Sequence, residues 1–344
     1  MRICEFDYEL PEELIAQEPL DQRDASRMLV LNRQTQKWSD SVFSALTQQL
    51  RPTDLVVINN TRVIPARLIG KRRPSGGRVE FLLVRELSPR VWQTLVRPGS
   101  RVKQGDLVEF GSGRLSAEIL DEPGEDLRQV RFNYEESFEH LLAEIGLTPL
   151  PPYIKRASGA SAIDRERYQT IFSRNPGAIA APTAGLHFTP QTLGEISKRA
   201  HLVEITLHVG YGTFEPVRTA DIEQHSVSPE RFQIAEETAQ RINEAKRSHS
   251  RVITIGTTTL RALESAVTDE GEIMPGKGDA TLTIKPGYQF RIADVLLTNF
   301  HLPRSSLLLL VSAFAGRNLI LDTYKHAVNE RYRFYSYGDC MLIV

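Results

Sequence analysis

The chain has 344 residues, of which 41% are hydrophobic and 25% are charged, and its formal net charge is −1. This is the composition of an ordinary globular protein, and the length allows two domains or one large domain with an insertion. Because the charges nearly cancel, the chain as a whole has no electrostatic reason to bind nucleic acid, so any such affinity must be local.

The cysteines and the apolar runs restrict the cellular setting. Cys4 and Cys340 lie at opposite ends, form no CxxC pattern and indicate a reducing compartment. They also exclude a three-cysteine iron–sulfur motif. The first residues lack the basic and apolar regions of a signal peptide, and the longest apolar stretch, residues 307–314, is too short to cross a membrane. We therefore expect a cytoplasmic protein with no membrane partner.

The first half of the chain predicts two kinds of structure. Residues 42–50 read as a helix, and residues 55–58 as a buried strand. From about residue 66 the pattern changes to short β-type runs separated by clusters of Gly, Pro and Ser. These runs cover residues 66–70, 78–85, 91–96, 107–110, 115–120 and 129–132. Six short strands at nearly regular spacing predict a small antiparallel barrel or sandwich.

The second half predicts alternating strands and helices. A helix capped by Asn133 with Glu136 and ended by Gly146 should close the β region, and the Pro-rich residues 149–152 mark the return to the first domain. Helices follow at residues 190–200, 235–248, 259–267, 305–315 and 319–331, and a closing strand at 340–344. The sequence thus predicts an α/β domain of residues 1–65 and 149–344, interrupted by a β domain of residues 66–148.

Four apolar runs of the α/β region end in loops of small or polar residues. These are residues 180–188, 205–214, 252–259 and 296–303, and three of them carry a histidine: His187, His208 and His301. Strands that end in such loops place ligands at the carboxyl edge of an α/β sheet. The four loops together predict one shared site of an enzyme.

Each loop also has a plainer interpretation. Thr258 or Thr259 would cap the helix that follows, and the free N–H groups beyond favour an anion, although hydroxyl caps are common without any ligand. His301 could act as an acid or base, or could bond the loop backbone. The small residues before His187 let a backbone approach a ligand, and His208 either belongs to the core or points into a pocket. One sequence does not separate these alternatives.

Several chemistries have no motif in this chain. The eight histidines form no HxH, HxxxH or His/Cys pair, so we expect no metal site. Walker and GxGxxG loops are absent, which excludes the usual nucleotide-binding sites. No GxSxG elbow occurs, which counts against an α/β-hydrolase.

A local basic stretch lies where the two predicted domains join. It contains six cations and no acid: Arg62, Arg67, Lys71, Arg72, Arg73 and Arg78. Lys and Arg are usual at a solvated sheet edge, so the stretch could be without function. In an otherwise neutral chain it modestly favours contact with a phosphate backbone.

Nine segments along the chain resemble one family. They are DASR (24–27), NTRVIPAR (60–67), PLPPYI (149–154), YQT (168–170), APTAGLHF (181–188), TLHVGYGTF (206–214), GTT (256–258), TNFHLP (298–303) and YRFYSYGD (332–339). The chain resembles the S-adenosylmethionine:tRNA ribosyltransferase-isomerases of queuosine biosynthesis over its whole length. The resemblance implies an α/β main domain with an inserted small six-stranded antiparallel β-barrel. It also implies transfer and isomerisation of the ribosyl unit of S-adenosylmethionine onto 7-aminomethyl-7-deazaguanine in tRNA, giving epoxyqueuosine-tRNA, adenine and methionine.

One position departs from the family pattern. After His225 the family usually has a second histidine, and here that position is Ser228. We interpret the change as an indication that this histidine is not essential. A diverged member with an altered substrate is the alternative.

The implied chemistry assigns roles to residue types. A base near the sulfonium and an acid at the adenine suit His187, His208 and His301, with Asp339 as a partner. For substrate binding we expect Thr183, Gly185, Gly210, Thr257, Thr258, Thr259, Asn299 and Arg304, and for tRNA binding Arg62, Arg67, Lys71, Arg72 and Arg78. No metal or cofactor is expected, since S-adenosylmethionine is a co-substrate, and we expect a monomer. Rival interpretations are a non-catalytic RNA-binding adaptor and an S-adenosylmethionine-dependent methyltransferase.

Overall fold

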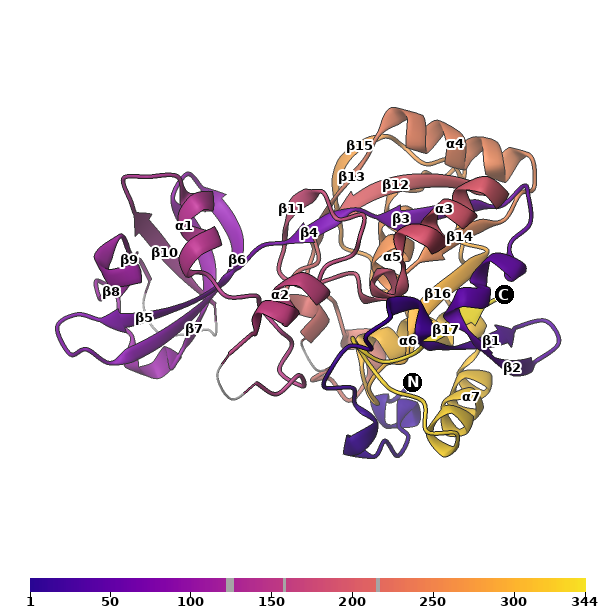
Figure 1. The fold of residues 1–344 in the computed structure, drawn as a ribbon, viewed down its shortest axis with the longest axis horizontal. Helices are drawn as coiled ribbons and strands as arrows, with labels where there is room; N and C mark the ends of the chain where they lie inside the picture. The colour runs from indigo at the N-terminus through magenta and orange to yellow at the C-terminus, as the bar shows by residue number, and fades with distance from the viewer. Residues whose placement is uncertain (122–126, 157–158, 215–216) are drawn as a thin grey trace.

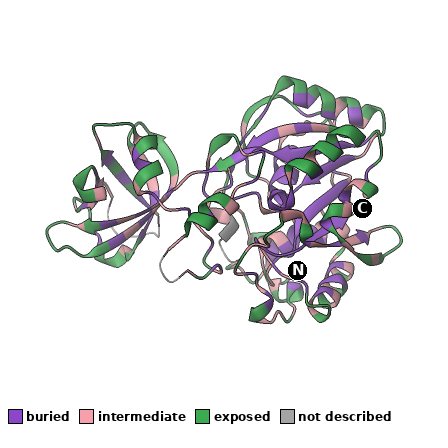
Figure 2. Cartoon of the chain, in the orientation of Figure 1, coloured by how far each residue is buried: buried purple, intermediate pink, exposed green. Residues whose placement is uncertain are grey.

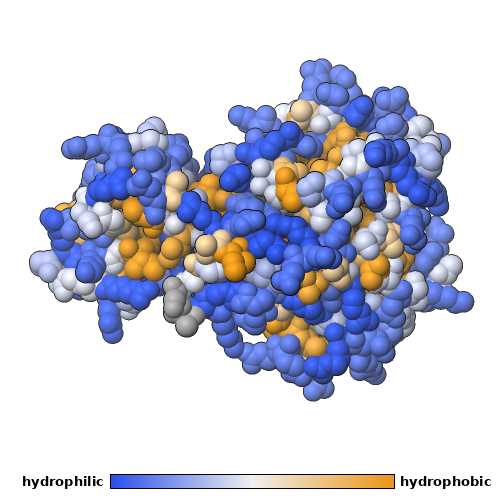
Figure 3. Space-filling view, viewed as in Figure 1, coloured by the Kyte–Doolittle hydropathy of each residue, from blue (hydrophilic) through white to orange (hydrophobic). Residues whose placement is uncertain are grey.

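The computed structural model describes residues 1–121, 127–156, 159–214 and 217–344. Figure 1 shows an α/β body and a β-barrel that stands beside it, connected through a narrow neck. Strands β4 (Thr61–Val63) and β11 (Asn175–Ala178) pair in this neck, and helix α2 (Ala162–Arg167) lies next to it. The face seen in Figure 3 is mostly hydrophilic, with apolar residues in separate patches.

A mixed sheet forms the centre of the α/β body. Among the described residues it has nine strands in the order β15-β13-β12-β3-β14-β16-β17-β1-β2. Their bounds are Gly276–Ala280, Glu230–Ile234, His201–Leu207, Leu55–Asn59, Val252–Ile255, Val295–Asn299, Cys340–Ile343, Arg27–Asn32 and Lys37–Val42. The central strands β12, β3, β14 and β16 are parallel, so their carboxyl ends meet at one edge.

Helices cover both faces of this sheet because successive strand residues point to opposite sides. Leu55 and Val57 of β3 pack in one core with α4 and α5, whereas Val56 and Ile58 pack with α3 on the other face. The helices are α3 (Pro190–Arg199), α4 (Glu236–Arg247), α5 (Thr257–Ala266), α6 (Ser306–Ala315) and α7 (Arg317–Asn329). Figure 2 shows the buried strands between exposed helix faces.

The second body is a closed barrel in the order β10-β7-β6-β5-β8-β9. In chain order β5 to β10 span Arg67–Arg72, Arg78–Ser88, Val91–Arg97, Leu107–Phe110, Leu115–Ile119 and Leu127–Asn133. Alternate residues such as Phe81, Phe110 and Phe132 fill its interior, and α1 (Phe138–Ile145) packs against it. A Cβ at Gly70 would lie 2.6 Å from the Phe110 ring, so only glycine fits there. The predicted fold class, an α/β domain with an inserted six-stranded antiparallel barrel, is confirmed.

Several local predictions are wrong at the ends of elements. Ser137, not Asn133, caps α1 by accepting from the His140 N–H. The helix predicted at 42–50 is a 3₁₀ helix, Phe43–Gln49. Helix α5 begins at Thr257 after Gly256, so neither Thr258 nor Thr259 is its cap. Strands β1, β2, β13 and β15 were not predicted. Strands β2 (KWSDSV) and β15 (GKGDA) are mostly polar, whereas β1 (RMLVLN) is an apolar run and β13 alternates buried and exposed residues with a buried glutamate at its start.

In the part of the chain that the structure describes, no helix taken singly has both the length and the hydrophobicity needed to cross a membrane. Only α6 and α7 counted together, bent by 114° at their junction, would meet that test on length and composition.

Candidate active site

The ends of β14 and β16 open into one cavity, called here the strand-end pocket. The Gly256 N–H donates to Leu297 O at 2.8 Å, which holds the loop after β14 beside the end of β16. All four predicted loops contribute to its lining, with Thr183, Val209, Gly256, Thr257, Thr258, Thr298, Asn299 and His301. Tyr153, Tyr168, Tyr335 and Ser336 complete the wall. The carboxyl edge of the parallel strands therefore carries a hydroxyl-rich pocket.

Helix α5 presents its amino end to this pocket. Its N-cap is Gly256, with a φ of +91°, a backbone conformation that glycine adopts without strain. Because glycine has no side chain to cap the helix, the first N–H groups of α5 are left for another acceptor. The Thr258 hydroxyl is buried and has no hydrogen-bond partner among the described residues. Such a helix end favours an anionic group such as a carboxylate.

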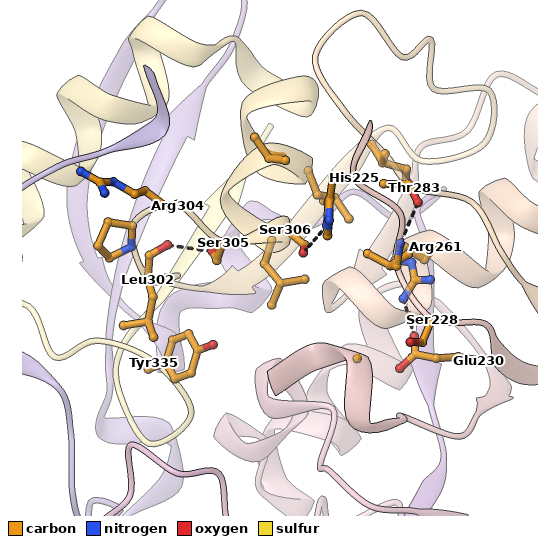
Figure 4. Close-up of a pocket in the computed structure, with 17 residues that line it drawn as sticks. His225, Ser228, Glu230, Arg261, Thr283, Leu302, Arg304, Ser305, Ser306 and Tyr335 are labelled. Carbon is orange, nitrogen blue, oxygen red and sulfur yellow. Dashed lines mark hydrogen bonds and ion pairs between the residues drawn. The ribbon is translucent and has the colours of Figure 1, made fainter. Parts of the chain in front are cut away.

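A second cavity, called here the α6 pocket, adjoins the first. Leu307 and Tyr335 line both. Figure 4 shows His225 pointing to Ser306 at the start of α6, and Arg261 meeting Glu230 on the opposite wall. His225 Nε2 lies 2.8 Å from Ser306 Oγ, and the Arg261–Glu230 ion pair is almost fully buried. The two cavities together form an elongated site. The amino end of α5 lies at the strand-end pocket, and the amino end of α6 lies at the α6 pocket.

The three predicted histidines do not meet in one place. His301 lines the strand-end pocket, where its Nε2 lies 3.0 Å from Thr298 Oγ1, and burial lowers its pKa to about 3. His187 lies behind that pocket, and burial together with Arg333 and Arg23 lowers its pKa to about 4. His208 faces the cleft between the barrel and the sheet, 2.9 Å from Thr61 Oγ1.

Asp339 is bound by the backbone, and among the described residues no hydrogen bond joins it to a histidine. Its two carboxylate oxygens accept the N–H groups of Arg27 and Arg333, each at 2.8 Å. It is 2% exposed, and burial raises its pKa. These contacts join β1 to the loop before β17 and use both carboxylate oxygens, and the predicted role of Asp339 as a partner in proton transfer stays a prediction.

Comparison with known proteins shows the family of this chain. A family model described as queuosine biosynthesis protein matches residues 3–343. The chain belongs to this family. A relative from Carboxydothermus hydrogenoformans is 50% identical over 345 residues and one from Natranaerobius thermophilus is 49% identical; each match covers 100% of this chain, and 100% and 99% of those proteins. Both are named S-adenosylmethionine:tRNA ribosyltransferase-isomerase.

A solved structure supports the same assignment. It is described as S-adenosylmethionine tRNA ribosyltransferase from Thermotoga maritima, with 37% identity and a TM-score of 0.57 over 99% of this chain and 100% of that one. The resemblance inferred from the sequence and the prediction of an enzyme, a transferase and isomerase, are thereby confirmed.

The other predicted binding residues of this family member divide into two groups. Thr183, Thr257, Thr258 and Asn299 line the strand-end pocket, and Arg304 lines the α6 pocket, where it also pairs with Asp7. Three residues line neither pocket: Gly185, Gly210 and Thr259. A Cβ at Gly185 would lie 2.8 Å from Phe172, the Gly210 N–H donates to Glu230, and the Thr259 hydroxyl donates to Ile255 O at 2.7 Å. In this structure the contacts of these three residues are with neighbouring protein groups, and their role in substrate binding stays a prediction.

Two tyrosines and one buried ion pair of the site were not among the residues predicted from the sequence. Tyr153 Oη lies 2.5 Å from Ser336 Oγ, and Tyr335 packs edge-on against Tyr153. Burial raises the pKa of Tyr335 to about 12, so this phenol keeps its proton at neutral pH. Both tyrosines stood within the family motifs, but an aromatic residue there reads equally well as core. Glu230 and Arg261 are 31 positions apart, and nothing in the sequence pairs them.

The position that departs from the family pattern lines the α6 pocket. Ser228 lies across from Gly212, where a Cβ on Gly212 would come within 3.1 Å of the Ser228 Cβ. A histidine side chain at position 228 would occupy part of the space that the smaller serine leaves open. The substitution therefore changes the shape of the α6 pocket and leaves the lining of the strand-end pocket as it is.

The fold partly neutralises the basic stretch. Arg67 pairs with Glu80 at 2.8 Å, and Arg72 with Asp106 at 3.4 Å. Arg73 pairs with Glu109. The remaining three, Arg62, Lys71 and Arg78, are exposed, and within the described ranges no carboxylate pairs with them. The stretch is therefore half as cationic as the sequence suggested.

Proposed function

We propose that this protein transfers and isomerises the ribosyl unit of S-adenosylmethionine onto 7-aminomethyl-7-deazaguanine in tRNA. The products are epoxyqueuosine-tRNA, adenine and methionine. Family membership supports this proposal, as do relatives that are named for S-adenosylmethionine and tRNA. The observation that carries it is the elongated site at the carboxyl edge of the sheet, with the uncapped amino end of α5 in its wall.

The co-substrate fits this arrangement through its charges. The methionine carboxylate would bind at the α5 amino end, beside Thr257 and Thr258. The aminomethyl nitrogen of the modified base is the nucleophile, so the protein needs no covalent nucleophile of its own. We propose no metal and no further cofactor.

Proton transfer in the strand-end pocket falls to His301. Its lowered pKa keeps the ring neutral at pH 7, which leaves a nitrogen able to accept a proton. A pKa of about 3 makes it a weak base, so its contribution depends on close contact with the activated proton. The protonated phenols of Tyr153 and Tyr335 can donate hydrogen bonds in the same pocket. His208 would act from the cleft at the barrel, where the nucleic acid arrives.

The tRNA backbone would lie along the clefts beside the barrel. One cleft is lined by Arg67, Arg97, Lys155 and Arg156, with Glu80 as the acid in its lining. The segment that follows Tyr153 of the strand-end pocket lines this cleft with Ile154 and Lys155. The exposed Arg62, Lys71 and Arg78 extend this cationic path onto the neck and barrel.

The test is to incubate the purified protein with S-adenosylmethionine, a chelator and tRNA carrying the deazaguanine base. Free adenine and free methionine should appear in equal amounts. Matched tRNA with an unmodified guanine at the same position is the control, and it should give neither product.

Two outcomes would assign the chain to its rivals. Formation of S-adenosylhomocysteine would indicate a methyltransferase. Tight binding of the tRNA without release of adenine would indicate a non-catalytic adaptor.

A further inference from the structure

The orientation of the Asn299 amide is fixed by its neighbours. One atom of the amide lies 3.0 Å from Tyr335 O, and because a carbonyl can only accept, that atom is Nδ2. The same Nδ2 lies 3.3 Å from His187 Nε2. Tyr335 presents its carbonyl from a backbone with a φ of +73°, a strained conformation for a residue with a side chain. Oδ1 must therefore face away from His187.

These contacts also define the tautomer of His187. Since Asn299 Nδ2 donates to Nε2, the neutral ring carries its proton on Nδ1. Nδ1 lies 2.7 Å from Ser26 Oγ, and the Ser26 hydroxyl donates in turn to Arg23 O at 3.3 Å. The lowered pKa of His187 is in accord with a ring that stays neutral in this position. Both ring nitrogens are thus used inside the protein, and neither reaches the strand-end pocket.

The amide oxygen of Asn299 is the group left without a partner. Asn299 is 3% exposed, and within the described part of the chain its Oδ1 has no hydrogen-bond partner. A buried acceptor without a donor is unfavourable, so it marks a place for a donor from a ligand. Asn299 ends β16 and lines the strand-end pocket together with Gly256, Thr257 and Thr258, the residues at the amino end of α5. The pocket therefore offers an acceptor beside a helix amino end.

We propose that Asn299 Oδ1 accepts a hydrogen bond from the α-ammonium group of the methionyl end of S-adenosylmethionine, and that His187 is the positioning residue that holds this amide in place. An amino acid carries its ammonium and carboxylate on the same carbon, which matches an acceptor beside the amino end of α5. This rests on the proposed function for the identity of the ligand. It assigns His187 a role that needs no proton transfer.

Binding measurements test the first half of the proposal. Calorimetry would compare S-adenosylmethionine with the analogue that lacks the α-amino group. The wild-type protein should prefer S-adenosylmethionine by roughly 10- to 100-fold, the range of a hydrogen bond to a charged group. Asn299→Ala should reduce this preference to near one. Thr258→Val is the matched control, since it acts on the carboxylate side and should weaken both ligands equally. An undiminished preference in Asn299→Ala would overturn the assignment.

Substitutions of His187 test the second half. Glutamine can accept from Asn299 and donate to Ser26 but cannot carry a proton, whereas leucine can do neither. His187→Gln should keep both the ligand preference and kcat, and His187→Leu should lose the preference and raise KM for S-adenosylmethionine. If His187→Gln keeps the preference but loses ~10²-fold or more in kcat, His187 transfers a proton and the positioning role is wrong.

Two controls keep these results interpretable. Thermal melting identifies any variant that fails to fold, and should His187→Leu fail, Ser26→Ala removes the acceptor of the Nδ1 proton and should reduce the preference instead. Release of adenine by the wild-type protein is scored separately. A wild-type protein without that activity would contradict the proposed function, whereas an active one with unchanged variants would contradict only this inference.

Discussion

Replacing Glu230 with alanine is expected to destabilise the fold by roughly 3–5 kcal/mol, because it leaves the Arg261 cation buried without a carboxylate. Glu230 is 3% and Arg261 is 6% exposed. The second carboxylate oxygen also accepts the Gly210 N–H at 2.8 Å. Without Glu230, the guanidinium would keep, among the described residues, hydrogen bonds to the carbonyls of Ala280 and Leu282, which cannot neutralise its charge.

The size of this effect separates a charge defect from a simple loss of contacts. Changing Glu230 and Arg261 together to methionine removes both charges and keeps most of the volume. The double variant should cost much less than the sum of the two single variants, by roughly 3 kcal/mol, since a buried ion pair can often be exchanged for apolar side chains at little cost.

The assay is urea unfolding at pH 7, followed by tryptophan fluorescence. Trp38 lies on β2 of the α/β body and Trp92 on β7 of the barrel, so a Trp92→Phe background reports the body alone. Glu272→Ala is the control, because its pair with Arg247 is exposed and should contribute below about 1 kcal/mol. The reasoning is refuted if Glu230→Ala costs no more than this control.

Three further expectations concern the pH dependence of stability, the tRNA-binding charges and the need for a metal. Burial lowers the pKa of His187 to about 4 and that of His301 to about 3 in the folded state, below the value of 6.5 in the unfolded state. The unfolded state therefore binds more protons, and the stability of the fold should decrease as the pH drops from about 6.5. A urea midpoint that stays constant between about pH 7 and about pH 4.5 would count against this expectation. Changing Arg62, Lys71 and Arg78 together to alanine should weaken tRNA binding by roughly 2–4 kcal/mol and flatten its salt dependence, and an unchanged slope would place the footprint elsewhere. Turnover should persist in EDTA, and its loss with recovery on adding Zn²⁺ or Mg²⁺ would show a metal requirement.

Local periodicity was enough to predict most of the framework. The barrel strands alternate buried and exposed residues, as in β10, and the turn clusters between them locate their ends. Helices α3, α4 and α7 bury residues three or four positions apart, as expected when one face of a helix meets the core, whereas α5 and α6 are buried over most of their length. The strand-end loops after β14 and β16 were predicted for the same reason, since a buried apolar run must stop where the chain turns back.

Tertiary packing decided what the sequence left open. Thr258 and Thr259 are adjacent and equivalent in composition, but the 100° step along α5 puts the first in the pocket and buries the second against Ile255. Strand pairing brought Glu80 beside Arg67, which removed a cation from the predicted tRNA surface. The contact of Asn299 with His187 joins residues 112 positions apart. Such contacts depend on which strands are neighbours, and local sequence carries no information on that order.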